Sequence, residues 1–251
     1  LSPSSAASDV YKRQKYHPMK SLAPRDVTAR AIYTEMTRRG EDFVYLDVRH
    51  KDPEQTRRHF PNIYEKCLSL GIDITRDLIP VTPAAHYCCG GVKVDLNGET
   101  SIRRLYALGE TSCTGLHGAN RLASNSLIEA VVYADQAAKH AASQLASVEI
   151  QEGIPDWDFE GTQHTEEMLM IIQSKREMQA IMSNYVGIVR SNLSLERALR
   201  RLSIIYEETE ELHNKIKPNR ELCELRNMIA VAYLVIKQGS ALKESVGCHY
   251  N

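Results

Sequence analysis

The sequence predicts an α+β chain in two parts, a mixed region over residues 15–148 and an all-α bundle of three helices over residues 162–251. Strand and helix signals alternate in the first part, whereas the apolar residues of the second fall at helical spacing in three stripes. Between them, residues 149–161 are acidic and broken by glycine and proline, as in a linker. Residues 1–14 are rich in serine and lack periodicity, so we expect a disordered or non-native leader there.

The composition argues against several classes of function. The 251 residues suffice for one large domain or two smaller ones, and 31 Lys and Arg against 32 Asp and Glu leave no charge excess for nucleic acid or an anionic membrane. No apolar run approaches the roughly 20 residues that span a bilayer. The six cysteines and nine histidines show no metal-ligand spacing. This favours reduced thiols in the cytoplasm, with a Cys88-Cys89 disulfide as the alternative.

The mixed region should begin with a helix over residues 23–38. Pro24 suits its first turn, and Asp26 suits the positive N-terminal end of the helix dipole. Residues 43–47 are a strand candidate. A short helix is expected over residues 59–71, because a glycine in the left-handed conformation can end it.

Extended structure should follow. Residues 79–86 contain two prolines, which disfavour a helix. A hairpin is expected over residues 91–108, with Asn97-Gly98 at its turn and a return strand over residues 105–108. Asn-Gly between strand residues is a strong short-range hairpin signal.

The most informative segment joins this strand to a helix through a polar loop. The strand ends at Glu110, the loop carries Arg121, and a helix over residues 127–146 is launched by a Ser-Asn-Ser sequence. A helix N-terminus offers unpaired N–H groups and roughly half a positive charge, which suits an anionic cofactor. The backbone N–H groups of Ser126 and Leu127 would lie there. An ordinary N-capped helix is the alternative.

The apolar stripes of the second part predict three amphipathic helices with short connections, the second ending before Pro218 and the third closed by Gly239. If the stripes contacted a partner instead of each other, this part would be a binding or assembly module. The stripes are Met178, Ile181, Met182, Tyr185, Val186 and Val189; Leu195, Leu199, Leu202, Ile205, Tyr206 and Leu212; and Leu222, Leu225, Ile229, Ala232 and Ile236.

Several side chains could serve a dicarboxylic substrate or a cofactor. Arg25 and Arg121 suit planar carboxylates, because a guanidinium forks two hydrogen bonds and stays charged. His86 lies in an extended segment before a double glycine, and Glu110, at a strand end, suits a hydroxyl of a cofactor sugar or ribityl chain. Taken singly, Arg25 could be a solvated residue, His86 a core histidine and Glu110 a surface carboxylate. His117 has no evident partner, so we expect a structural role.

Three separated blocks resemble the FAD-dependent flavoproteins that include the flavin subunits of succinate dehydrogenase and fumarate reductase. They are LAPRDVTARAI, PVTPAAHYCCGGVKVDLNGETS, and the run from LYALGE through HGANRLASNSLIE. The resemblance implies a fragment of a Rossmann-type FAD-binding flavoprotein. It would hold part of a capping domain over residues 15–80 and the carboxyl-terminal part of the FAD-binding domain over residues 81–148, followed by the bundle. No GxGxxG motif occurs in the chain, so the half that carries it is expected upstream.

The resemblance also implies roles for individual residues. Arg25 matches the family's proton donor or acceptor, and His86 and Arg121 match ligands of the substrate carboxylates. Contacts to non-covalently bound FAD are implied for Glu110, Ser126 and Leu127.

Details of these sequence motifs favour the branch of the family that oxidises L-aspartate. PAAHY, ANRLASNS and EMQAIMSNYVGIVRSNLSLERALRRL are similar to that branch. It implies oxidation of L-aspartate to iminoaspartate, with oxygen or fumarate as electron acceptor. This would be the first step of de novo NAD biosynthesis, with a functional link to quinolinate synthase. The alternative is a succinate dehydrogenase or fumarate reductase flavin subunit. The isolated fragment is expected to be inactive.

Overall fold

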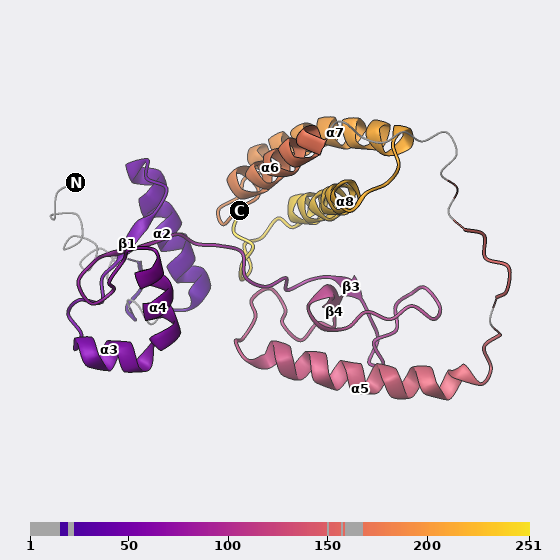
Figure 1. The fold of residues 1–251 in the computed structure, drawn as a ribbon, viewed down its shortest axis with the longest axis horizontal. Helices are drawn as coiled ribbons and strands as arrows, with labels where there is room; N and C mark the ends of the chain where they lie inside the picture. Colours follow the sequence, from indigo (N-terminus) through magenta and orange to yellow (C-terminus); the bar gives the residue numbers. More distant parts are fainter. Residues whose placement is uncertain (1–15, 20–22, 150, 157, 159–167) are drawn as a thin grey trace. The chain divides into compact units, whose positions relative to one another are not determined.

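The structure is a computed structural model that describes residues 16–19, 23–149, 151–156, 158 and 168–251. The chain divides into two compact units, the first ending at His86 and the second beginning at Tyr87 (Figure 1). The predicted leader and several residues of the predicted linker lie outside the described residues. Among the helices that are described, none combines the length and apolar character that a membrane span requires.

Unit 1 contains three described helices and a two-stranded antiparallel sheet. The elements follow in the order α2 (Arg25–Arg39), β1 (Val44–Leu46), α3 (Pro53–His59), α4 (Pro61–Ser69) and β2 (Ile79–Val81). The two strands pair with Val44 opposite Val81. The expected first helix, first strand and extended proline-containing segment are therefore confirmed.

The sequence does not predict α3 as a helix of its own. The helix expected over residues 59–71 joins the last residue of α3 to α4. Asp52 caps α3, because its Oδ1 accepts a hydrogen bond from the Gln55 N–H at 2.7 Å, and Pro53 occupies the first helical position. The helix expected over residues 59–71 is shorter, since α3 ends at His59 and α4 begins at Pro61.

Unit 2 combines a small parallel sheet, a long helix and a helical bundle. Its elements are β3 (Val92–Lys93), the 3₁₀ turn η2 (Gly109–Thr111), β4 (Ser112–Cys113), α5 (Asn125–Leu145), α6 (Met168–Tyr185), α7 (Asn192–Lys215) and α8 (Arg220–Ala241). β3 pairs in parallel with β4, with Val92 opposite Ser112.

The expected hairpin over residues 91–108 is wrong. The turn forms at Gly98, whose φ is +76°, but residues 91–96 do not pair with residues 105–108. The isolated antiparallel bridge of this region joins Glu99 to Tyr106, which both lie after the turn. The reason is Asp95, whose Oδ1 accepts hydrogen bonds from the Asn97 and Glu99 N–H groups at 2.8 and 2.9 Å. This side chain closes the turn locally, which competes with a strand ladder.

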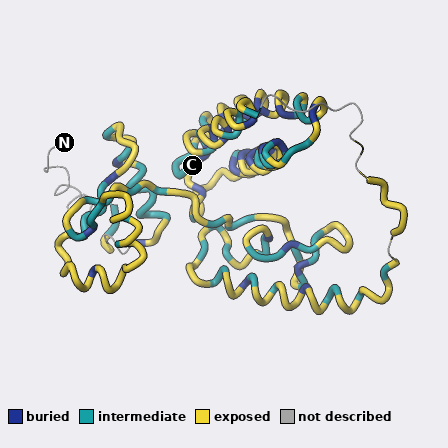
Figure 2. Tube along the Cα trace, in the orientation of Figure 1, coloured by how far each residue is buried: buried dark blue, intermediate teal, exposed yellow. Residues whose placement is uncertain are grey.

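The three-helix bundle is confirmed. α6, α7 and α8 contact one another, and buried positions recur along each of them (Figure 2). Ser191 and Ser194 form a capping box at the start of α7, and Asn219 caps α8. Most stripe residues lie in or against the core, whose buried members are Ile171, Met178, Ile181, Val186, Leu195, Ala198, Leu202, Ile205, Ile216, Leu222, Leu225, Ile229, Ala232 and Ile236.

Three details of the stripes need correction. α6 ends at Tyr185, so Val189 lies beyond the helix. Tyr206 is exposed on α7. Gly239 does not close α8, which continues to Ala241.

Two leucines of α8 test the bundle core. Leu222 is 0% exposed and Leu234 is 54% exposed. We expect Leu222→Ala to lower the free energy of unfolding by about 2–5 kcal/mol, because it leaves a cavity in the core. The matched change Leu234→Ala should cost less than about 1 kcal/mol. Urea denaturation followed by circular dichroism measures both, and equal losses would contradict this assignment of the core.

An ion pair in unit 1 predicts a pH dependence. Arg49 Nη2 lies 2.9 Å from Asp47 Oδ2, and hydrogen bonding by Arg49 lowers the pKa of Asp47 from 3.8 to about 2. Since the folded pKa is depressed, the stabilisation is present above pH 3.8 and is lost as the pH falls through about 2.

We expect Arg49→Met to return the Asp47 pKa toward 3.8, as measured by carboxyl carbon NMR titration. Arg76→Met, which removes a different ion pair of unit 1, is the control and should leave Asp47 unchanged. A pKa that stays near 2 in Arg49→Met would show that Arg49 does not cause the shift.

Candidate functional site

Helix α5 begins without the cap that its sequence suggests. Ser124 precedes the helix in the left-handed conformation, with a φ of +75°, and its side chain makes no cap hydrogen bond. The second and third helical residues are Ser126 and Leu127, whose backbone N–H groups belong to the first turn. The alternative of an ordinary capped helix loses its support.

Arg121 is held at this helix start by two contacts. Its Nη1 donates a hydrogen bond to Ser126 Oγ at 2.7 Å. Its guanidinium carbon lies 4.4 Å from the centroid of the Tyr87 ring, in a cation–π contact. No other hydrogen bond of the guanidinium is formed among the described residues, so its remaining donors can serve a ligand.

Tyr87, which carries the Arg121 guanidinium, also reaches a buried carboxylate, Glu129. Glu129 Oε2 accepts from His117 Nε2 at 2.7 Å and from the Tyr87 hydroxyl at 3.4 Å, and its Oε1 accepts a short hydrogen bond from the Thr114 hydroxyl. The His117 and Glu129 side chains are 6% and 2% exposed. The Tyr87 and His117 rings meet edge to face, with centroids 5.2 Å apart. The structural role expected for His117 thus has a partner in Glu129.

The tyrosine of this network stays a hydrogen-bond donor. Burial raises the pKa of Tyr87 above 10.0, and the charges of Glu129 and Glu110 raise it further. The phenol is therefore protonated over the whole range in which an enzyme is assayed.

Glu110 lies in the 3₁₀ turn η2 and not at the end of a strand as expected. Its Oε1 accepts a hydrogen bond from the Cys88 N–H at 2.9 Å, and the residue is exposed. The alternative of a plain surface carboxylate therefore understates its contacts. The parallel pairing of β3 with β4 brings these two segments together.

The loop before α5 is also held from the bundle side of unit 2. The Cys248 N–H donates to the Ala119 carbonyl at 2.9 Å. Gly247 has a φ of +56°, and a Cβ there would lie 2.5 Å from the Ala119 carbonyl oxygen. The close approach of the carboxyl-terminal turn to this loop therefore requires glycine.

The other two predicted substrate residues lie in unit 1. Arg25 is the first residue of α2 and is exposed, which agrees with a solvated helix start. His86 is exposed, so the alternative of a core histidine is wrong. Neither side chain makes a hydrogen bond or ion pair within the described residues.

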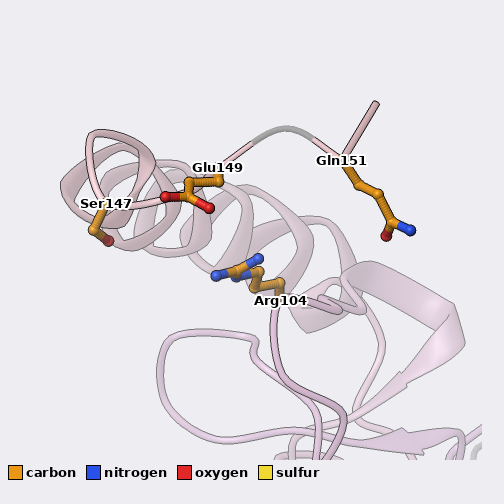
Figure 3. A pocket seen from close by; sticks show the side chains of 4 residues that line it. All are labelled: Arg104, Ser147, Glu149 and Gln151. Atoms are coloured by element: carbon orange, nitrogen blue, oxygen red, sulfur yellow. The ribbon is translucent and has the colours of Figure 1, made fainter. Parts of the chain in front are cut away.

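Other candidate sites are weaker. All six cysteines are free, including Cys88 and Cys89, and the described residues contain no cluster of metal-ligating side chains. A hollow of about 420 Å³ at the C-terminal end of α5 contains none of the predicted site residues (Figure 3). Its lining is Arg104, Ser147, Glu149 and Gln151.

The start of α5 fits an anionic or polar cofactor. The first turn of the helix has no side-chain cap, so its N–H groups can reach a ligand. Glu110 is exposed and uses only Oε1 among the described residues, which leaves Oε2 for a hydroxyl group. Both observations suit FAD, which carries hydroxyl groups and an anionic reduced ring.

The sequence reasoning missed Tyr87 and Glu129. The sequence gives no signal for Glu129, because on α5 this charged residue is buried while Ile128 and Val131 are exposed, the reverse of what residue type predicts. Tyr87 gives no signal either, because its ring contact with Arg121 joins distant parts of the chain.

Comparisons with protein families and curated proteins point in one direction. A profile described as "FAD binding domain" matches residues 8–127, and one described as "Fumarate reductase flavoprotein C-term" matches residues 175–251. An L-aspartate oxidase of Pseudomonas aeruginosa is 48% identical over 236 residues, which cover 94% of this chain and 44% of the relative. A chloroplastic L-aspartate oxidase of Oryza sativa is 44% identical, with coverages of 94% and 38%. The chain spans less than half the length of these relatives.

Solved structures share the fold. A quinol-fumarate reductase with menaquinol molecules has a TM-score of 0.79 and 28% identity, covering 94% of this chain and 47% of that chain. Mycobacterium smegmatis Sdh1 has a TM-score of 0.73 and 28% identity, with coverages of 96% and 43%. The resemblance predicted from the three sequence blocks is confirmed.

Two adjacent glycines test the segment that Glu110 holds. Gly91 has a φ of +149°, and a Cβ there would lie 2.3 Å from the Thr111 carbonyl oxygen, whereas a Cβ at Gly90 would meet nothing within 4 Å. We expect Gly91→Ala to lower the free energy of unfolding by more than about 2 kcal/mol, and Gly90→Ala by less than about 1 kcal/mol. Urea denaturation compares the two variants, and similar losses would show that β3 and β4 are not in this close contact.

Proposed function

The chain belongs to the succinate dehydrogenase and fumarate reductase flavoprotein family, and from this premise we propose that its protein is an FAD-dependent L-aspartate oxidase. The reaction is oxidation of L-aspartate to iminoaspartate. The observation that carries the proposal is the identity of 48% to an L-aspartate oxidase over 94% of the chain, against 28% to a fumarate reductase of the same fold.

Arg121 is the proposed ligand of one substrate carboxylate. The contacts with Ser126 and the Tyr87 ring fix the guanidinium before a substrate arrives. A guanidinium that is already oriented loses less entropy on binding and can fork two hydrogen bonds to a planar carboxylate. His86 is the proposed hydrogen-bond partner of a substrate carboxylate, and Arg25 the proposed proton donor or acceptor beside the substrate.

The proposed cofactor is FAD, held without a covalent bond. The N–H groups of Ser126 and Leu127 would stabilise negative charge on it, and Glu110 would accept a hydrogen bond from one of its hydroxyl groups. When bound, FAD supplies the acceptor for the hydride that leaves the substrate α-carbon. The residues of this chain contribute orientation, because clamped carboxylates present that carbon in a fixed direction.

Finer features of the proposal concern the electron acceptor and the product. We propose oxygen or fumarate as the acceptor; fumarate is, like aspartate, a four-carbon dicarboxylate that the same carboxylate ligands can bind. The imine product hydrolyses in water, so a functional link to quinolinate synthase, which would consume it in de novo NAD biosynthesis, is proposed as well. The alternative function is that of a succinate- or fumarate-converting flavin subunit, supported by the structural likeness to quinol-fumarate reductase.

The test uses the complete reading frame that contains this chain, purified with FAD. Under anaerobic conditions, we expect L-aspartate to bleach the flavin absorbance and succinate not to bleach it. Fumarate or air should then restore the absorbance. Stopped-flow spectroscopy measures both steps.

The two substrates are each other's control in this experiment. Bleaching by succinate alone would establish the alternative function. No bleaching by either compound, in a preparation that retains its FAD, would refute both functions.

A further inference from the structure

We propose that Glu129 and His117 are positioning residues for Arg121, and that they act through the Tyr87 ring to set the affinity for a dicarboxylate. This inference rests on the proposed function of the same site. Neither side chain is assigned a role by the family resemblance, and both are almost fully buried.

Glu129 is the point at which three segments of unit 2 meet. Its carboxylate receives donors from Tyr87, from Thr114 after β4, and from His117 in the loop before α5. A buried carboxylate is stable only while such donors remain in place. Glu129, in the first turns of α5, therefore holds Tyr87, Thr114 and His117 in place together.

Tyr87 connects Glu129 and His117 to Arg121. The hydroxyl bond of 3.4 Å to Glu129 is long, but the His117 ring, held to Glu129 at 2.7 Å, also packs edge-on against the Tyr87 ring. The Tyr87 ring in turn carries the guanidinium at 4.4 Å. A ring held by the His117 ring and at its own hydroxyl gives the guanidinium a fixed plane.

The network includes no route for a proton to the substrate. The Tyr87 phenol remains protonated, and the His117 and Glu129 side chains are almost fully buried. Their contribution should therefore appear in the binding of the substrate and not in the chemical step.

Four variants of the FAD-loaded, full-length protein test the proposal. Glu129→Met removes the acceptor and keeps the length of the side chain. Glu129→Gln is the conservative variant, because its amide oxygen can accept from His117 and Tyr87 while its NH₂ donates to the Thr114 hydroxyl. Tyr87→Phe removes only the long hydroxyl bond.

Tyr106→Phe is the matched control. The Tyr106 hydroxyl lies 2.8 Å from Nδ1 of His140, which is on α5 as Glu129 is. The Tyr106 and His140 rings also meet edge to face. Like Tyr87 with His117, this pair is a tyrosine packed edge to face against a histidine ring, but neither residue makes a hydrogen bond or ring contact with Arg121.

The test compares KM and kcat for L-aspartate among these variants. It also compares the Kd of succinate, obtained from the perturbation of the flavin spectrum. Glu129→Met should raise KM and the succinate Kd together by about tenfold or more, with kcat within about threefold, since a misplaced binding group costs about this much. Glu129→Gln should stay within about threefold of the wild type, Tyr87→Phe should raise KM a few-fold, and Tyr106→Phe should stay within about twofold.

Several results would overturn the proposal. One is an unchanged KM in a Glu129→Met protein that retains its FAD, and another is a loss in kcat alone. A Glu129→Gln variant as impaired as Glu129→Met would assign the effect to charge instead of geometry. If Glu129→Met does not fold, Tyr87→Phe decides, and a KM equal to that of Tyr106→Phe refutes the proposal.

The proposed function fails separately from this inference. If the wild type is not reduced by L-aspartate, the oxidase function is refuted. The succinate Kd of the variants still tests whether the network sets dicarboxylate affinity.

Discussion

The arrangement of the segments around the start of α5 depends on one buried carboxylate finding its hydrogen-bond donors. Removing a carboxylate from water costs several kcal/mol unless it is fully hydrogen-bonded. Glu129 meets this demand with donors from Tyr87 and from Thr114 and His117 of the loop before α5, which lie far from Tyr87 in the sequence. Once these stretches meet at the start of α5, Arg121 has a ring on one side and a hydroxyl group on the other. The site is thus a consequence of satisfying that buried group.

The two parts of unit 2 are stabilised in different ways. The bundle has a continuous apolar core along α6, α7 and α8. In the described residues from 87 to 149, by contrast, the buried apolar side chains are Ala107 and Ala137. Such small groups bury little area, so the hydrogen bonds and backbone contacts of this region carry more of its order. Two of these close backbone contacts require glycine: Gly91 lies against Thr111, and Gly247 of the carboxyl-terminal turn lies against Ala119.

The sequence predicts the bundle well because helix formation and apolar periodicity are both local. Leu222, Leu225 and Ile229 repeat at helical spacing, and their burial follows from that pattern. The hairpin prediction is wrong because the signal at Asn97-Gly98 is local, whereas Val92 pairs with Ser112, which lies beyond the expected return strand. Periodicity does not report such a parallel pairing between distant residues.

In the candidate site, too, local features could be predicted from the sequence and contacts between distant residues could not. Arg121, Ser126 and Glu110 could be named from a loop that leads into a helix, and the structure gives Arg121 and Ser126 a direct hydrogen bond. Glu129 could not be named from it, because a charged residue on an amphipathic helix is ordinarily placed on the solvent side.

The predicted substrate residues differ in how far the chain prepares them for a ligand. Arg121 is held by Ser126 and Tyr87, whereas Arg25 and His86 are exposed and make no hydrogen bond within the described residues. A side chain that is ordered only on binding pays its conformational entropy at that moment, and a side chain already ordered does not. Under the proposed function, Arg121 should therefore contribute most to the initial capture of a dicarboxylate. Groups that become ordered later suit the reacting end of the substrate, because order gained there can be coupled to the chemical step.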